Sequence, residues 1–197
     1  GPLASGKTQL GRCPQCALPS PAGQTCGACL RDAPHFDATF ARWSYDFPVR
    51  EMILALKYRA RLALAPSLAA SLAGQFRPQE ADCLIPLPVH PARLAERGFN
   101  QSVEIARHLA QHWNLPLLVD LCVKDRIIAP QASLPWKARR KNIRGAFRCT
   151  QDLGGKKVVV VDDVMTTGAT LDEFARVLKQ RGASRVVNVV VARTLRE

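Results

Sequence analysis

Two adjacent carboxylates and the hydroxyl-rich loop that follows them have the residue types and spacing of a site for a phosphorylated sugar. Asp162 and Asp163 are followed, after two apolar residues, by the loop Thr166, Thr167, Gly168, Ala169 and Thr170. Hydroxyls and backbone N–H groups at the start of a helix bind phosphate, whereas carboxylates repel phosphate and accept hydrogen bonds from sugar hydroxyls. One ligand, a ribose 5-phosphate, satisfies both groups. The alternative is an ordinary strand-to-helix turn in which the two aspartates are solvated.

The residues on either side predict the strand and the helix that would position this site. Residues 157–161 include four β-branched residues in a row and predict a buried parallel strand, with the acid pair directly after its end. Apolar residues at helical spacing predict a helix over 171–181. Thr170 is the expected N-cap, because its hydroxyl can accept a backbone N–H of the first turn. The carboxyl end of a parallel strand is where open α/β sheets bind their ligands.

Strands and helices alternate along the rest of the chain. The predicted strands are 36–45, 82–89, 117–123, 157–161 and 185–192, and the predicted helices are 49–58, 62–72, 100–113 and 171–181. This alternation predicts an α/β fold with a doubly wound, mostly parallel sheet.

The composition fits one α/β domain with a small appendage. The chain has 197 residues, 47% of them hydrophobic, which is enough for a core. Its net charge of +12 favours anionic ligands or nucleic acid. No apolar run approaches the ~20 residues of a membrane span, and no signal peptide is visible, so we expect a cytoplasmic protein without membrane insertion. Residues 1–6 contain no initiator Met and are expected to be a remnant of recombinant expression.

Four cysteines near the N-terminus have the spacing of a structural Zn²⁺ site. Cys13 and Cys16 form one CxxC pair, Cys26 and Cys29 form a second, and two such pairs can place four thiolates around one ion. Residues 7–35 are too few to bury a core, so the metal would supply the folding energy of this zinc-binding module. Two disulfides are the alternative, and a cytoplasmic location argues against them. The other cysteines lack ligand spacing and are expected to be core or incidental thiols: Cys83, Cys122 and Cys149.

Several sequence blocks resemble those of known families. Residues 158–170, VVVVDDVMTTGAT, resemble the ligand-binding motif of type I phosphoribosyltransferases. From Cys13 onward the chain is similar to the ComF family of competence-associated, phosphoribosyltransferase-like proteins. Further matching blocks are the double CxxC, LKY at 56–58, IPLPVH at 85–90, RGFNQ at 97–101, and the series Gln131, Leu134, Arg139, Asn142, Gly145 and Phe147. The resemblance implies that residues 36–197 form a domain of the type I phosphoribosyltransferase kind.

The resemblance also implies a ligand, phosphoribosyl pyrophosphate (PRPP), bound together with Mg²⁺. Asp162 and Asp163 would bind the ribose and are the expected catalytic residues, and the loop would bind the 5-phosphate. The expected PRPP-binding residues are Asp162, Asp163, Val164, Met165, Thr166, Thr167, Gly168, Ala169 and Thr170.

A second set of residues is expected to bind the pyrophosphate group. The loop 88–97 follows the end of a predicted strand, and arginines bind such groups in a bidentate way. The expected residues are Pro88, Val89, His90, Arg93, Arg97 and Lys57. The alternatives are a salt bridge at the helix start for Arg97, a solvated helix end for Lys57 and no role for His90.

The segment 124–148 has no convincing periodicity and carries eight Lys or Arg residues and one acid. By resemblance it would be a hood or flexible segment over the site. Aromatic rings that stack on bases, among cations that follow the backbone, are typical of single-stranded nucleic-acid binding. The residues expected to contact nucleic acid or an acceptor are Trp136, Lys137, Arg139, Arg140, Lys141 and Arg144. A solvated basic loop with Trp136 packed inward is the alternative.

Two functions are therefore open. The first is a phosphoribosyltransferase that stabilises the leaving pyrophosphate electrostatically and uses an acceptor that the sequence does not identify. The second is a non-catalytic module that binds single-stranded DNA and keeps the PRPP pocket as a sensor or relic. The family's link to competence implies a role in DNA uptake, with other competence proteins as partners. The sequence does not reveal the oligomeric state.

Overall fold

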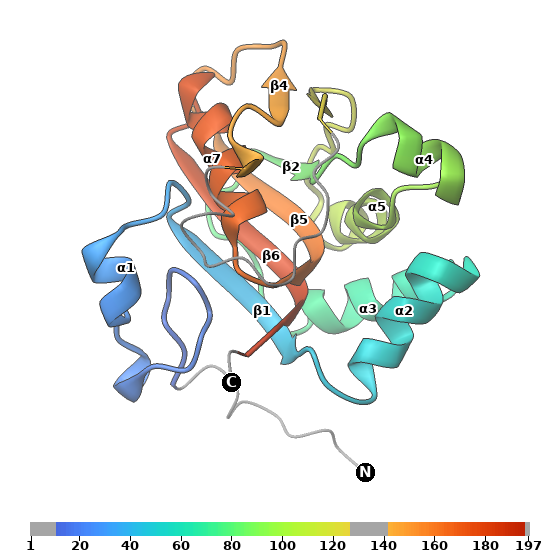
Figure 1. The fold of residues 1–197 in the computed structure, drawn as a ribbon, viewed down its shortest axis with the longest axis horizontal. Helices are drawn as coiled ribbons and strands as arrows, with labels where there is room; N and C mark the ends of the chain where they lie inside the picture. Colours follow the sequence, from blue (N-terminus) through green and yellow to red (C-terminus); the bar gives the residue numbers. More distant parts are fainter. Residues whose placement is uncertain (1–10, 127–141, 196–197) are drawn as a thin grey trace.

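A four-stranded parallel sheet forms the centre of the molecule (Figure 1). The computed structural model describes residues 11–126 and 142–195. The strand order is β1–β6–β5–β2, with the bounds β1 (Ala38–Ser44), β2 (Cys83–Pro86), β5 (Lys157–Met165) and β6 (Arg185–Arg193). Each neighbouring pair is parallel. The predicted α/β class with a mostly parallel sheet is confirmed.

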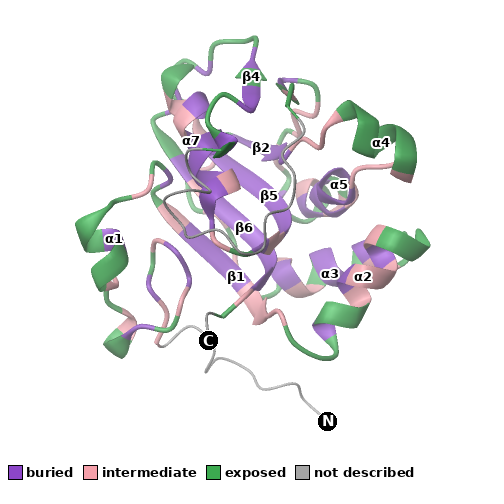
Figure 2. Cartoon of the chain, viewed as in Figure 1, coloured by how far each residue is buried: buried purple, intermediate pink, exposed green. Residues whose placement is uncertain are grey.

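Helices cover both faces of the sheet, which is buried between them (Figure 2). One face packs on α2 (Val49–Arg59), α3 (Leu64–Ala73) and α5 (Gln101–Trp113), and the other packs on α7 (Ala169–Gln180). Successive strand residues point to opposite faces, so Val159 and Val161 join the first core and Val158 and Val160 join the second. Among the described residues, no helix is both long and apolar enough to cross a membrane.

Strand β5 is longer than its sequence predicted. It pairs with β6 from Lys157 as far as Met165, which lies opposite Arg193. The prediction that Asp162 and Asp163 follow the strand is therefore wrong, because both lie within its last four residues. Pairing with β6 overrides the weak strand preference of Asp, and it fixes the backbone of the acid pair.

The predicted strand over 117–123 is also wrong. Leu117 makes only an isolated parallel bridge to Leu84. The next strand, β3 (Cys122–Lys124), pairs antiparallel with β4 (Phe147–Cys149) in a separate two-stranded ribbon. A disulfide joins Cys122 to Cys149 across this ribbon, so the expectation of incidental thiols fails for these two, whereas Cys83 is a buried free thiol.

The cysteine module, residues 11–35, lies beside the edge strand β1 (Figure 1). It contains the short elements η1 (Pro21–Gly23) and α1 (Gly27–Arg31). The backbone N–H of Thr39 in β1 donates to the Pro14 carbonyl at 3.0 Å, and Arg12 Nη2 donates to Ser44 Oγ at 3.3 Å. The buried cysteines of the module belong to the same hydrophobic cluster as α7. The module therefore shares a core with the sheet.

Candidate functional site

The acid pair lies at the carboxyl end of β5, and each aspartate has its own partners. Asp162 is 7% exposed and Asp163 is 2% exposed. Ser102 Oγ, at the start of α5, donates a hydrogen bond to Asp162 Oδ1 at 2.9 Å. Asp163 Oδ2 forms an ion pair with Lys57 Nζ at 2.5 Å, and Asp163 Oδ1 accepts the backbone N–H of Val164 at 2.8 Å. Lys57, expected near the pyrophosphate, thus reaches the acid pair from the end of α2.

Burial makes two adjacent carboxylates costly to ionise. Burial first, and then the negative charge of Asp163, raise the pKa of Asp162 to about 7, although Lys57 and the Ser102 hydrogen bond favour the ionised form. Burial acts to lower the pKa of Lys57, but the charges of Asp163 and Asp162 outweigh it and the pKa is raised. Lys57 therefore stays cationic at neutral pH. A ligand that brings a cation or hydroxyl donors would favour ionisation of Asp162.

The loop after β5 leads into a helix, as predicted, but the helix begins earlier than expected. α7 begins at Ala169, and its N-cap is Gly168, which has a φ of 86°. The expected N-cap role of Thr170 is wrong, because Thr170 already lies within the first turn. Gly168 adopts this left-handed conformation without a Cβ clash, and Thr167 Oγ1 accepts the N–H of Ala169 at 3.4 Å. The free N–H groups of the first turn are suited to an anion.

A pocket of about 210 Å³ with four cationic side chains adjoins the acid pair through Lys57. Its lining residues are Lys57, Tyr58, Val89, His90, Arg93, Arg97, Gln101 and Lys124. The structure thereby brings together the residues expected at a pyrophosphate site, and Pro88 precedes Val89 in the chain. None of these described lining residues is acidic. The pocket is suited to a ligand with several negative charges.

Residues 91–97 form a helix, α4 (Pro91–Arg97), where a loop was predicted. His90 is its N-cap, since His90 Nδ1 accepts the N–H of Ala92 at 3.1 Å. Arg97 Nη1 donates to Gln101 Oε1 at 2.5 Å, and the Arg97 guanidinium lies 5.4 Å from the ring centre of Tyr58. These neutral contacts orient Arg97 without neutralising its charge. His90 thus has a structural contact, and Arg97 presents a positive charge to the pocket.

Lys124 is a pocket residue that the sequence did not single out. It lies on β3, and its Nζ is 5.5 Å from the ring centre of Phe147. Burial lowers the pKa of Lys124, while the charge of Asp162 acts to raise it and that of Arg93 to lower it. Ser102 and Gln101 were missed in the same way. The helix predicted over 100–113 contained the available signal, because both residues lie in its first turn, where α5 begins.

Most residues expected to contact nucleic acid or an acceptor lie outside the described part of the chain: Trp136, Lys137, Arg139, Arg140 and Lys141. Arg144 is described and is exposed. Its backbone carbonyl accepts a hydrogen bond from Arg126 Nη1 at 3.2 Å. This contact involves the backbone of Arg144 alone, and contact of its side chain with nucleic acid stays a prediction.

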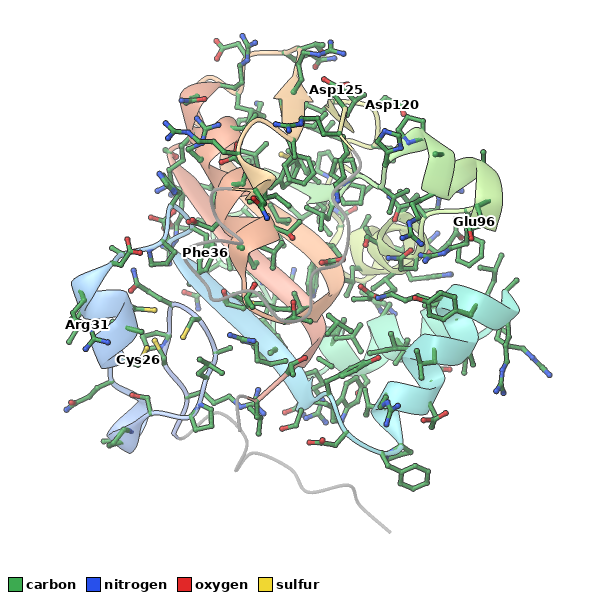
Figure 3. All side chains as sticks on the ribbon, viewed as in Figure 1. Cys26, Arg31, Phe36, Glu96, Asp120 and Asp125 are labelled. Atoms are coloured by element: carbon green, nitrogen blue, oxygen red, sulfur yellow. A yellow bond between two sulfur atoms is a disulfide. The ribbon has the colours of Figure 1, made fainter. Side chains whose placement is uncertain are left out.

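The four cysteines of the module converge as their spacing predicted (Figure 3). Their Sγ atoms lie within 4.8 Å of one another, and those of Cys16 and Cys26 are 3.7 Å apart. Four thiolates at ~2.3 Å from a tetrahedral Zn²⁺ would be separated by about 3.8 Å. The N–H of Cys26 also donates to Cys13 Sγ at 3.3 Å. All four are free thiols, and the cluster could bind a metal such as zinc.

The electrostatics of this cluster also favour a cation. Burial raises the pKa of Cys16 to about 11, with a further rise from Cys13 and an opposing hydrogen bond from the backbone of Leu18. Burial and the neighbouring Cys16 raise the pKa of Cys29 as well. Without a cation these two buried thiols therefore stay protonated at neutral pH, and a divalent metal would stabilise their ionised form.

Comparisons with known proteins identify relatives of the chain. Residues 99–196 match the family model described as the phosphoribosyl transferase domain. The chain is 32% identical over 197 residues to the DNA utilization protein YhgH of Escherichia coli O157:H7. The aligned region covers 96% of this chain and 87% of that protein.

Competence proteins and a phosphoribosyl enzyme are also similar to the chain. Competence protein F of Haemophilus influenzae is 27% identical, over 83% of this chain and 76% of that protein. Competence protein ComFC of Bacillus subtilis is 25% identical, over 89% of this chain and 75% of that protein. Among solved structures, the glutamine PRPP amidotransferase of B. subtilis has a TM-score of 0.46 and 23% identity, over 65% of this chain and 26% of that chain.

Proposed function

The chain belongs to the ComF family of phosphoribosyltransferase-like proteins, and from this premise we propose that it binds PRPP together with Mg²⁺. The observation that supports this most strongly is the arrangement around the end of β5. A buried acid pair is followed by a helix-start loop and adjoined by a pocket with four cations. PRPP carries a matching group for each: two ribose hydroxyls, a 5-phosphate and a pyrophosphate.

Each part of the site has a distinct role in this proposal. Asp162 and Asp163 accept hydrogen bonds from the ribose hydroxyls, and the hydroxyls and N–H groups of Thr166 to Thr170 hold the 5-phosphate. The pyrophosphate binds among Lys57, Arg93, Arg97 and Lys124. Carboxylate and phosphate oxygens are the ligands that Mg²⁺ prefers, and this ion supplies further positive charge to the pyrophosphate when bound.

The same arrangement supports group transfer. In that reaction the bond between the ribose C1 and a pyrophosphate oxygen breaks, and pyrophosphate leaves with the electron pair. A nucleophilic atom of the acceptor forms the new bond to C1. The cationic pocket stabilises charge on the leaving group, while the nearby carboxylates stabilise the positive charge that develops on the sugar. The chemical class of the acceptor is open in this proposal.

Isothermal titration of PRPP and Mg²⁺ into the full chain tests binding. We expect saturable binding by the wild type and none by the double variant Asp162→Asn, Asp163→Asn. Glu80→Gln is a matched control, because Glu80 is an exposed acid paired with Lys157 at the start of β5, and it should bind as the wild type does. A wild type without detectable binding, or a double variant with unchanged affinity, would contradict the proposal.

A thermal-shift comparison adds a second readout. A ligand that binds only the folded state raises its melting temperature. PRPP with Mg²⁺ should therefore raise the melting temperature of the wild type and of Glu80→Gln. The melting temperature of the double variant should not change. An equal shift in all three proteins would show that the acid pair does not hold the ribose.

A second function, binding of single-stranded DNA in competence, is supported by different observations. Similar proteins carry the names Competence protein F and DNA utilization protein, and this chain has a net charge of +12. Fluorescence anisotropy with a single-stranded oligonucleotide should show an affinity that falls as the salt concentration rises. For each contacted phosphate, the logarithm of the binding constant should fall by about 0.7 for a tenfold rise in salt concentration. Binding should survive the double Asp variant. Absent or salt-insensitive binding would refute this function.

The basic segment offers a sharper test of that function. Arg139→Ala should reduce the salt dependence, because it removes a phosphate contact, whereas Trp136→Ala should weaken binding at every salt concentration by removing a stacking platform. Exposed Arg61, on the short loop after α2, is a charge-matched control. If Arg61→Ala has the same effect as Arg139→Ala, binding follows total charge alone.

We also propose that the cysteine module holds one Zn²⁺ per chain in a structural role. Four thiolates complete a tetrahedral ion and leave no position for a substrate. The cysteine cluster with its short Sγ separation supports this assignment. A cytoplasmic location and competence proteins as partners stay predictions.

A further inference from the structure

Arg193, the last residue of β6, is a buried arginine with 1% of its surface exposed. Its Nε donates to the carbonyl of Cys16 at 2.8 Å. Its Nη1 donates to the carbonyls of Met165 and Thr194, both at 2.9 Å, and to that of Thr166. A guanidinium is a rigid, planar donor that can serve several carbonyls at once. One side chain therefore joins the cysteine module to the end of β5.

The acceptors of Arg193 lie at sensitive positions on both sides. Cys16 is a member of the cysteine cluster, so the place of its carbonyl depends on how its thiolate is held. Met165 ends β5 and Thr166 begins the ligand loop, residues 166–170. Their carbonyls set the direction in which the loop leaves the strand. If the Cys16 carbonyl moved, a buried charged donor would lose an acceptor, which is costly, and the guanidinium would shift toward new partners.

Two further contacts join the same parts of the molecule. The backbone N–H of His35 donates to Asp172 Oδ1 at 2.6 Å, and His35 Nδ1 lies 3.0 Å from that oxygen. Asp172 belongs to the first turn of α7, directly after the ligand loop. A cavity of about 70 Å³ has walls from both sides, including Cys16, Cys29, Phe36, Met165 and Thr167. Figure 3 labels Phe36 and Cys26 on the side of the molecule where the module lies.

We propose that Arg193 is a positioning residue through which the metal-bound state of the cysteine module sets the conformation of the ligand loop. In the metal-bound module the Cys16 carbonyl is fixed, Arg193 is fixed by it, and the loop leaves β5 in one direction. Loss of the metal frees the carbonyl and loosens the loop. The loop effect rests on the contacts of Arg193 and on the proposed Zn²⁺. The consequence for ligand affinity rests in addition on the proposed binding of PRPP.

Hydrogen exchange measured by mass spectrometry tests the loop effect without a ligand. Peptides covering 165–171 are followed in the zinc-loaded full chain and after removal of zinc by a chelator. We expect exchange of these peptides to become at least fivefold faster without zinc in the wild type, while peptides from α3 are unchanged. The α3 peptides show that the sheet domain stays folded. Exchange in α3 that rises together with the loop would mean global unfolding, and would overturn the proposal.

Two arginine variants separate coupling from general docking. Arg193→Lys keeps the charge but loses the planar fork, so its loop should exchange quickly with or without zinc, while zinc content stays near one equivalent. Arg12→Lys is the matched control, because Arg12 also joins the module to the sheet, through Ser44 Oγ, without touching the loop. It should keep the wild-type response. A zinc-insensitive wild-type loop, or equal behaviour of the two variants, would overturn the proposal.

A third experiment tests the coupling between zinc and PRPP binding, which must be reciprocal. If zinc tightens PRPP binding by some factor, PRPP must tighten zinc binding by the same factor, and couplings of this kind are typically about 5–150-fold. We expect PRPP with Mg²⁺ to lower the equilibrium transfer of zinc to a competing chelator at least fivefold in the wild type and not in Arg193→Lys. A wild type that does not bind PRPP would refute the proposed function, and the exchange experiment would still decide the coupling. A wild type that binds PRPP with unchanged zinc affinity would overturn the coupling alone.

Discussion

Replacing Asp162 by Asn removes one buried charge from the acid pair and keeps the shape of the side chain. The Asn Oδ1 can still accept the hydrogen bond that Ser102 Oγ now donates to Asp162. Changes at buried polar residues usually destabilise a protein. Here we expect the opposite at neutral and high pH, because burial and the charge of Asp163 oppose the ionisation of Asp162.

The sign and the size follow from the pKa of Asp162, which rises from its ordinary 3.8 to about 7 in the folded protein. The folded state holds this proton more tightly than the unfolded state, so the wild type loses stability as the pH rises from about 4 to about 7. About three pH units at ~1.36 kcal/mol each set an upper limit of about 4 kcal/mol. The proton equilibrium depends on all the charges around Asp162, so we expect less than this limit, about 2–4 kcal/mol, or roughly 4–16 °C in melting temperature for a chain of this size.

Urea unfolding of ligand-free protein between pH 4.5 and 8.5 measures this difference. The free energy of unfolding of Asp162→Asn should exceed that of the wild type at pH 8.5, and the gap should shrink toward pH 4.5. Asp125→Asn is a control, because Asp125 is exposed and paired with Arg148; its effect should be small at every pH. A variant less stable than the wild type at pH 8.5, or a gap that does not change with pH, would refute the reasoning.

Three more predictions concern the neighbours of the acid pair and the cysteine cluster. Lys57→Met should lower the free energy of unfolding at pH 8 by about 2–3 kcal/mol, because Asp163 loses a partly buried partner. Asp163→Asn in the same chain should restore much of it, and simple additivity in urea unfolding would contradict the ion pair's role. Lys124→Gln should weaken PRPP binding about tenfold with little change in melting temperature, and unchanged affinity in calorimetry would remove Lys124 from the site. Cys29→Ser should reduce bound zinc well below one equivalent in elemental analysis; full zinc content would show that Cys29 is not a ligand.

The sequence predicted the elements whose signals are local. The β-branched residues of β5 and β6, the loop after β5 and the spacing of the four cysteines all correspond to parts of the structure. The errors at β5 and α7 concern boundaries, where pairing partners and backbone geometry decide. β5 continues through two aspartates because β6 pairs with it, and α7 begins at Ala169 because Gly168 can adopt a positive φ.

Some errors came from local signals that were overlooked. α4 has Pro91 at its first position and Gly98 directly after its end, with a φ of 82°, and both are typical of helix ends. The helix was not predicted because it is short and because the residues around it are polar, so it has no apolar periodicity. His90 before Pro91 also serves as its N-cap, a role for which histidine is not usually considered.

Other parts of the site carry no local signal. Cys122 and Cys149 are 27 residues apart and pair only because β3 and β4 align them. Lys124 reaches the pocket through the same ribbon. Arg193 contacts Cys16 across most of the length of the chain. The partners of these residues cannot be predicted from a single sequence, because the contacts exist only after tertiary packing has brought distant segments together.

Lys57 explains how the two halves of the site depend on each other. Its Nζ pairs with Asp163 and its side chain also lines the cationic pocket. An anion in the pocket would compete with the carboxylate for the ammonium group, and Asp163 would then need a further partner inside the protein. Ribose hydroxyls or a metal ion can provide that partner. A ligand with only a pyrophosphate, or only a ribose, would bind either the Lys57 ammonium or the Asp163 carboxylate and leave the other group without a ligand partner. The position of Lys57 therefore favours a ligand that carries both groups on one molecule.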